Sequence, residues 1–132
     1  MNIRKYHREG SERMKPLIYI SGPITDYPEY AKRFKECELF LVYENKYTPI
    51  NPASLVTFVL SNNGVKNPTY NDYMKAALIL MMKDGCRDII FLKDWHKSKG
   101  AQIEHMYAKF FKYKRHLYFH TEKNNKRRLQ LK

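Results

Sequence analysis

The apolar residues of this chain form two kinds of pattern: short continuous runs and longer stretches with helical spacing. The segments from Leu17 to Ile20 and from Arg87 to Leu92 contain apolar runs without strict alternation, a pattern typical of strands covered on both faces. Tyr47 to Ile50 and Arg115 to Phe119 are two further β-prone pieces, each next to turn-forming or polar residues. The sequence therefore predicts four strands.

Three stretches between these strands have the spacing of helices. The first covers about residues 28–44, where apolar side chains recur on one helical face. The second covers residues 73–83, whose centre is apolar nearly all round and therefore predicts a well-buried helix. The third follows the turn-forming Ser98-Lys99-Gly100 and continues to Phe111.

Residues 53–70 fit two interpretations. The apolar residues from Leu55 to Leu60 favour a short helix, whereas Asn62-Asn63-Gly64 and Asn67-Pro68 are turn-formers. The alternative to a helix is a mobile flap. Either way, strands alternate with helices along the chain, which predicts an α/β fold with right-handed crossovers. We expect a small doubly wound, flavodoxin- or Rossmann-like fold, with a mostly parallel sheet of four to five strands flanked by helices.

The length of 132 residues suits a single domain, and the charge is concentrated at its ends. The formal net charge is +12, but residues 16–111 contribute only +2. The sequence thus divides into a mobile basic arm at 1–14, an α/β domain at 15–120 and a basic tail at 121–132. The basic ends are either solvated and solubilising, or they attract nucleic acid or anionic small molecules.

Two cysteines, Cys37 and Cys86, show no metal-ligand spacing, so we expect them to be buried rather than paired and expect no metal site. This composition fits a reducing cytoplasm. The N-terminus lacks the apolar segment of a signal peptide, and the longest apolar run is far too short to cross a bilayer. We therefore expect a cytoplasmic protein that does not enter membranes.

Candidate chemistry gathers where the third helix begins. Glu104 lies near its start, and Ser98, Gly100 and the backbone of Ala101 are placed to bind an anion at the free helix N–H groups. In a parallel sheet this junction lies at the carboxyl ends of the strands, where ligands bind. The residues alone favour the other interpretation of Glu104, a solvated glutamate stabilised by the helix dipole, and Ser98 is a helix cap under both interpretations.

Other residues near the predicted helices also have two interpretations. Asp72 is either functional or a helix-start residue, with Asn71 or Asp72 as the cap. Trp95 and His96 suit a packed aromatic and a surface histidine, although a ring in this loop can stack on a base. We expect Tyr19 to be structural. Neither a P-loop nor a G-x-G-x-x-G sequence is present, so the usual signatures of nucleoside-triphosphate and dinucleotide binding are absent.

Four short pieces stand in a fixed order along the chain: Tyr19 to Thr25 (YISGPIT), Asn51 to Ala53 (NPA), Asn71 to Met74 (NDYM) and Ser98 to Glu104 (SKGAQIE). Together they resemble domain of unknown function family 4406. That family looks like a branch of the nucleoside 2-deoxyribosyltransferase-like superfamily, which also contains nucleotide 5′-monophosphate N-glycosidases. The resemblance covers about residues 16–119 and departs from the transferase pattern between Leu92 and Ser98.

The resemblance implies roles for individual residues. Glu104 falls at the nucleophilic glutamate, and Asp72 resembles an aspartate used near the base or sugar. Ser21, Gly22 and Pro23 match the loop that lies beside the sugar. Substrate-binding roles are likewise implied for Asp94, Ser98, Gly100 and Ala101, of which Ser98 and Gly100 match the spacing that holds phosphate.

Two hypotheses follow. The first is an enzyme that cleaves the N-glycosidic bond of a nucleoside or nucleoside 5′-monophosphate, or transfers its deoxyribosyl group, without a metal or organic cofactor. The second is a non-catalytic protein that binds or senses a nucleotide, or that associates with nucleic acid through the basic tails. The family resemblance also implies a homodimer or higher homo-oligomer with sites near the subunit boundary.

Overall fold

A computed structural model of the chain describes residues 15–121 and 126–131. The expected arm at 1–14 lies outside the described residues. In chain order the elements are β1 (Leu17–Ser21), α2 (Tyr30–Glu44), β2 (Thr48–Ile50), α3 (Pro52–Asn62), α4 (Tyr70–Met81), β3 (Cys86–Phe91), the 3-10 turn η1 (Trp95–Lys97), α5 (Lys99–Phe110), β4 (Lys114–Thr121) and β5 (Lys126–Leu131).

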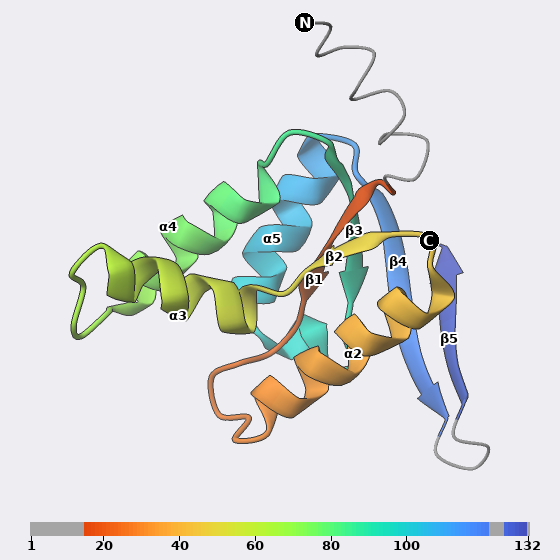
Figure 1. Cartoon of the computed structure of the whole chain (residues 1–132), viewed down its shortest axis with the longest axis horizontal. Helices are drawn as coiled ribbons and strands as arrows, with labels where there is room; N and C mark the ends of the chain where they lie inside the picture. Colours follow the sequence, from red (N-terminus) through yellow and green to blue (C-terminus); the bar gives the residue numbers. More distant parts are fainter. Residues whose placement is uncertain (1–14, 122–125, 132) are drawn as a thin grey trace, which may run out of the picture.

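The five strands form one sheet in the order β2-β1-β3-β4-β5 (Figure 1). β1 to β4 are mutually parallel, and β5 pairs antiparallel with β4. This confirms the expected fold class, a small Rossmann-like α/β domain. The chain leaves β1 toward β2 on one side and leaves β3 toward β4 on the other, so the neighbouring strands β1 and β3 flank a topological switch point.

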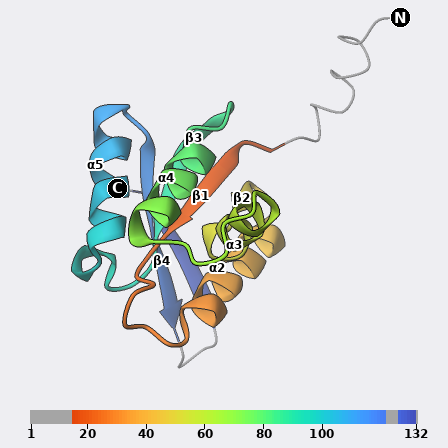
Figure 2. The same ribbon diagram turned by 90° about the vertical axis from the view of Figure 1, so that its left-hand side faces the viewer.

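Helices cover both faces of the sheet (Figure 2). α2 packs on the face that carries Ile18, Ile20 and Ile90. α4 and α5 lie on the opposite face, and α3 packs against α4 beside β2. Because successive strand residues point to opposite faces, the continuous apolar runs of β1 and β3 supply both cores at once.

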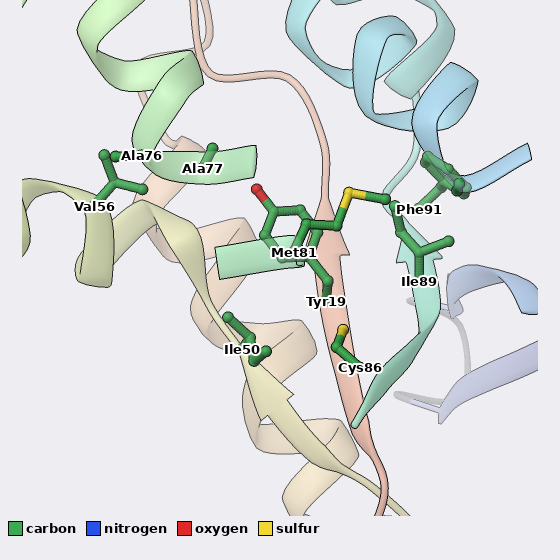
Figure 3. Packing of buried hydrophobic residues seen from close by; sticks show 10 residues of the cluster. Tyr19, Ile50, Val56, Ala76, Ala77, Met81, Cys86, Ile89 and Phe91 are labelled. Atoms are coloured by element: carbon green, nitrogen blue, oxygen red, sulfur yellow. The ribbon is translucent and has the colours of Figure 1, made fainter. Parts of the chain in front are cut away.

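Tyr19 lies at the centre of the core under α4 and α5 (Figure 3). Its fully buried ring packs among apolar side chains from β2, α3, α4, β3 and α5. Cys86 belongs to this core and Cys37 to the core under α2, and both are buried free thiols. The expectation that the cysteines are buried rather than paired is thereby confirmed.

Two helices begin earlier than the sequence predicts, because their caps lie outside the apolar pattern. Asn51 caps α3, and its side chain accepts a hydrogen bond from the backbone of Ala53, so this helix is longer than the expected 55–60 segment. Thr69 caps α4. The expectation that Asn71 or Asp72 is the cap is therefore wrong, since Asp72 is the third residue of the helix and closes the capping box that Thr69 begins.

The segment expected as a basic tail contributes a strand at Lys126–Leu131. The sequence pattern misses β5 because the segment has no apolar run, and its pairing comes from backbone hydrogen bonds to β4, with His116 opposite Leu131. Lys and Arg are common on edge strands, where they prevent further pairing. Within the described part of the chain, no helix is long and apolar enough to cross a membrane.

Candidate active site

A pocket of about 720 Å³ opens at the carboxyl ends of β1 and β3. Five parts of the chain line it: the loop after β1, α2 through Phe34, the start of α3, the start of α4, and the start of α5 with the turn before it. Its lining residues are Gly22, Ile24, Thr25, Asp26, Phe34, Pro52, Pro68, Thr69, Tyr70, Tyr73, Met74, Lys97, Ser98, Lys99, Gly100, Ala101 and Glu104. The pocket thus lies at the switch point, where the fold favours ligand binding.

Glu104 lines this pocket, and only 5% of its surface is exposed. Both of its carboxylate oxygens accept hydrogen bonds from β1. Tyr19 Oη donates to Oε2 at 2.5 Å, and Ser21 Oγ donates to Oε1 at 2.7 Å. The carboxylate is therefore held in one orientation by two side chains of the central strand.

Burial raises the pKa of Glu104 from its usual value to about 7, although the hydrogen bonds from Tyr19 and Ser21 act to lower it. The neighbouring tyrosines respond to the same carboxylate. Burial, and then the negative charge of Glu104, raise the pKa of both Tyr70 and Tyr73. Near neutral pH, Glu104 thus divides between its protonated and ionised forms.

Two glycines at the pocket allow neighbouring segments of the chain to pack closely. A Cβ on Gly22 would lie 2.8 Å from the Leu92 side chain, so any side chain there would push β1 away from the end of β3. A Cβ on Gly100 would lie 3.1 Å from Met74 Sδ, so Gly100 allows the starts of α4 and α5 to pack closely. The two glycines predicted as substrate-binding therefore also have a packing reason.

The start of α5 is arranged as the sequence predicts. Ser98 is its N-cap, and Ser98 Oγ accepts a hydrogen bond from the backbone of Ala101 at 3.1 Å. Among the hydrogen bonds of the described residues, none uses the amide N–H groups of Lys99 or Gly100. Lys97 and Lys99 line the pocket beside them. This end of the pocket therefore combines positive charge with available donors.

Asp72 lies outside the pocket lining, next to Thr69, which belongs to it. Its carboxylate accepts a hydrogen bond from the Thr69 backbone at 2.9 Å and closes the capping box of α4. The structure therefore does not bring Asp72 into one cleft with Glu104 and Gly22. Asp26, in the loop after β1, is the other carboxylic acid among the residues that line this pocket.

The remaining sequence candidates lie beside the pocket. Pro23 belongs to the loop after β1 and is fully buried. Asp94 has a positive φ of 66° and forms an ion pair with Lys97 at 3.9 Å. Trp95 stacks on His105 with ring centroids 4.7 Å apart, and His96 is exposed. Trp95 and His96 thus match the packed aromatic and surface histidine expected from the sequence.

Sequence reasoning missed the partners of Glu104. Tyr19 was expected to be structural, and Ser21 was expected to contact substrate rather than the carboxylate. A signal was present: Tyr19 and Ser21 are two residues apart on a strand and therefore share a face, which the helix after β3 must cover. The sequence does not show that the Glu104 side chain lies within hydrogen-bond distance of both Tyr19 and Ser21.

One of three comparisons with known proteins places the chain in a family. The family model described as Domain of unknown function (DUF4406) matches residues 16–116. A search of curated proteins and a search of solved structures each found no significant match. The matched range begins just before β1, ends within β4 and includes every residue that lines the pocket. On this match, the chain is a member of the DUF4406 family.

Proposed function

We propose that this protein acts on the N-glycosidic bond of a nucleoside or nucleoside 5′-monophosphate, by hydrolysis or by deoxyribosyl transfer, with Glu104 as the nucleophile. The observation that carries the proposal is the buried carboxylate of Glu104, fixed by Tyr19 and Ser21 in a pocket of nucleotide-compatible size. The resemblance to nucleoside 2-deoxyribosyltransferase-like proteins supports the assignment of the bond.

In the first step, a Glu104 oxygen forms a bond to the anomeric carbon while the bond from that carbon to the base nitrogen breaks. The electron pair of the broken bond leaves with the base, which takes up a proton. In the second step, water or the nitrogen of another base attacks the anomeric carbon, gives a proton back to the group that protonated the first base, and releases Glu104 as a carboxylate. Positive charge develops on the sugar in both steps, and the negative charge of Glu104 stabilises it.

Tyr19 and Ser21 are placed to help Glu104 leave the anomeric carbon in the second step. Each donates a hydrogen bond to one carboxylate oxygen, so each stabilises the carboxylate that the second step regenerates. They also restrict rotation of the carboxyl group, which reduces the entropy lost when the sugar is bound. The two residues thus act as positioning residues for Glu104.

The basic end of the pocket favours a phosphorylated substrate. Lys97, Lys99 and the amide groups at the start of α5 offer positive charge and donors to an anion. The apolar and aromatic side chains of Phe34, Tyr70 and Tyr73 line other parts of the pocket and suit a base and sugar. We therefore favour a nucleoside 5′-monophosphate over a nucleoside.

Protonation of the departing base needs an acid, and Asp26 is better placed than Asp72. Asp26 lines the pocket, whereas the Asp72 carboxylate is engaged by Thr69 at the start of α4. Asp26 is exposed and lines the pocket, so its carboxyl group is open to a bound substrate or to water. Asp26→Asn is expected to slow release most for bases that are poor leaving groups.

The decisive experiment incubates wild type, Glu104→Gln and the control Glu44→Gln with a panel of nucleosides and 5′-monophosphates. Chromatography measures free base. Glu104→Gln keeps the shape of the side chain, so we expect a fold unchanged by circular dichroism and a loss of base release of about 10⁴-fold or more. Glu44 is exposed at the end of α2, and its replacement leaves the rate unchanged. Equal rates for wild type and Glu104→Gln would refute a nucleophilic role.

A second function, nucleotide binding without turnover, is favoured by the position of Asp72 outside the pocket. Such a protein binds a 5′-monophosphate and releases no base. Calorimetric titration of wild type with the same monophosphates separates the two functions, since binding without base release over many protein equivalents selects the non-catalytic one.

A further inference from the structure

A second surface with chemical character lies at the opposite end of the sheet from the pocket. Parallel strands begin, and the helices that precede them end, at one edge of the sheet. Figure 1 shows α4 and α5 ending where β3 and β4 begin. We call the surface formed there the amino-end face, made of Lys83, Arg87, Phe110, Phe111, Lys112 and Lys114.

The amino-end face concentrates positive charge. Residues 82–87 and 109–115 together hold six Lys/Arg and one acid, Asp84, a net charge of +5, which equals the net charge of residues 16–115 as a whole. The side chains of Lys83, Arg87, Lys112 and Lys114 are exposed. The charge of this part of the protein is therefore local and presented to solvent.

Contacts within the fold make the face continuous. Tyr113, in the turn between α5 and β4, donates a hydrogen bond at 2.5 Å to the carbonyl of Met81 at the end of α4. β3 and β4 are adjacent, with Asp88 opposite Lys114 in register. Arg87 directly precedes Asp88, so the backbone of Arg87 and that of Lys114 lie on neighbouring strands. The sheet thus holds the backbone of these two cations side by side.

Two exposed aromatic rings lie among these cations. Phe110 is 77% exposed and Phe111 55% exposed, and their ring centroids are 4.9 Å apart. The helix dipole by itself favours lysine at the ends of α4 and α5, but it gives no reason for two phenylalanines in solvent. Two neighbouring exposed rings beside cations offer a flat apolar surface on which another ring can stack.

We propose that the amino-end face binds single-stranded nucleic acid. Cations neutralise the phosphates of a strand, and exposed rings stack on its bases. A duplex hides the faces of its bases, so the exposed phenylalanines favour a single strand as the partner. The face is separate from the pocket, and the two sites can be occupied together.

The test measures fluorescence anisotropy of a short labelled single-stranded oligonucleotide with the full chain. The variant R87Q/K112Q/K114Q is compared with K32Q/K35Q/K75Q, which removes the same charge from exposed lysines of α2 and α4 away from the face. We expect the first variant to bind at least tenfold more weakly and its slope of log affinity against log salt to fall by about 2. The second variant is expected to bind like wild type.

Phe110→Ala tests the stacking contribution. We expect it to weaken binding roughly fivefold or more while leaving the salt slope unchanged. Equal losses in the two triple variants would show that overall charge or the chain ends drive binding, which would overturn the proposal. So would a duplex bound as tightly as the single strand, or binding to anionic phosphatidylserine vesicles but not to the oligonucleotide.

Discussion

Glu104→Gln, the variant expected to lose base release, is also expected to gain stability relative to wild type as the pH rises above neutral. Burial raises the pKa of Glu104 to about 7, compared with 4.5 for an unburied glutamate. Between these two pH values the folded chain binds a proton that the unfolded chain has released. Stability from this group is complete below about pH 4.5 and is lost as the pH rises through 7.

The cost of ionising Glu104 in the folded protein amounts to about 3 kcal/mol at pH 8, because each unit of pKa corresponds to about 1.4 kcal/mol. Glutamine carries no charge at any pH and avoids this cost. It also places an amide beside Tyr19 and Ser21, whose hydroxyls donate to the carboxylate, and that mismatch adds a constant penalty. The penalty does not depend on pH.

Urea unfolding of wild type and Glu104→Gln at intervals from pH 4 to 8.5 separates the two effects. The difference in unfolding free energy is expected to move in favour of the glutamine variant by about 3 kcal/mol across this range. In thermal unfolding, the same change corresponds to a difference in melting temperature of about 10 °C at the upper pH. A difference that stays constant with pH would refute the reasoning, since it would mean that Glu104 titrates alike in both states.

Three further outcomes test the site. Tyr19→Phe removes a donor that holds the pKa of Glu104 down, so the acidic limb of the pH–activity profile should move to higher pH; an unmoved limb would contradict this. Gly22→Ala places a Cβ against Leu92 and should cost about 1–3 kcal/mol in urea unfolding, and the cost should shrink in a Leu92→Ala background. Asp72→Ala should lose about 1 kcal/mol of stability through the capping box with base release unchanged, and slower release would restore Asp72 to the site.

The sequence determined the fold class because local patterns and chain order suffice for it. Continuous apolar runs in β1 and β3, helical spacing around Phe34, and the caps and breakers between them point to one parallel α/β arrangement. The start of α5 could also be predicted from the sequence, because Ser98 caps the helix through its own backbone neighbourhood. Glu104 was located on the correct helix for the same reason.

Only the tertiary structure decided what surrounds Glu104. Tyr19 and Glu104 are 85 residues apart, and neither local spacing nor composition encodes that their side chains meet across the sheet and helix layers. Asp72 shows the converse, since the sequence allows it a functional role or a place at the helix start, and Thr69, three residues before it, engages its carboxylate in the capping box of α4. β5 was decided in the same way, because an edge strand depends on the backbone of β4 rather than on apolar residues of its own.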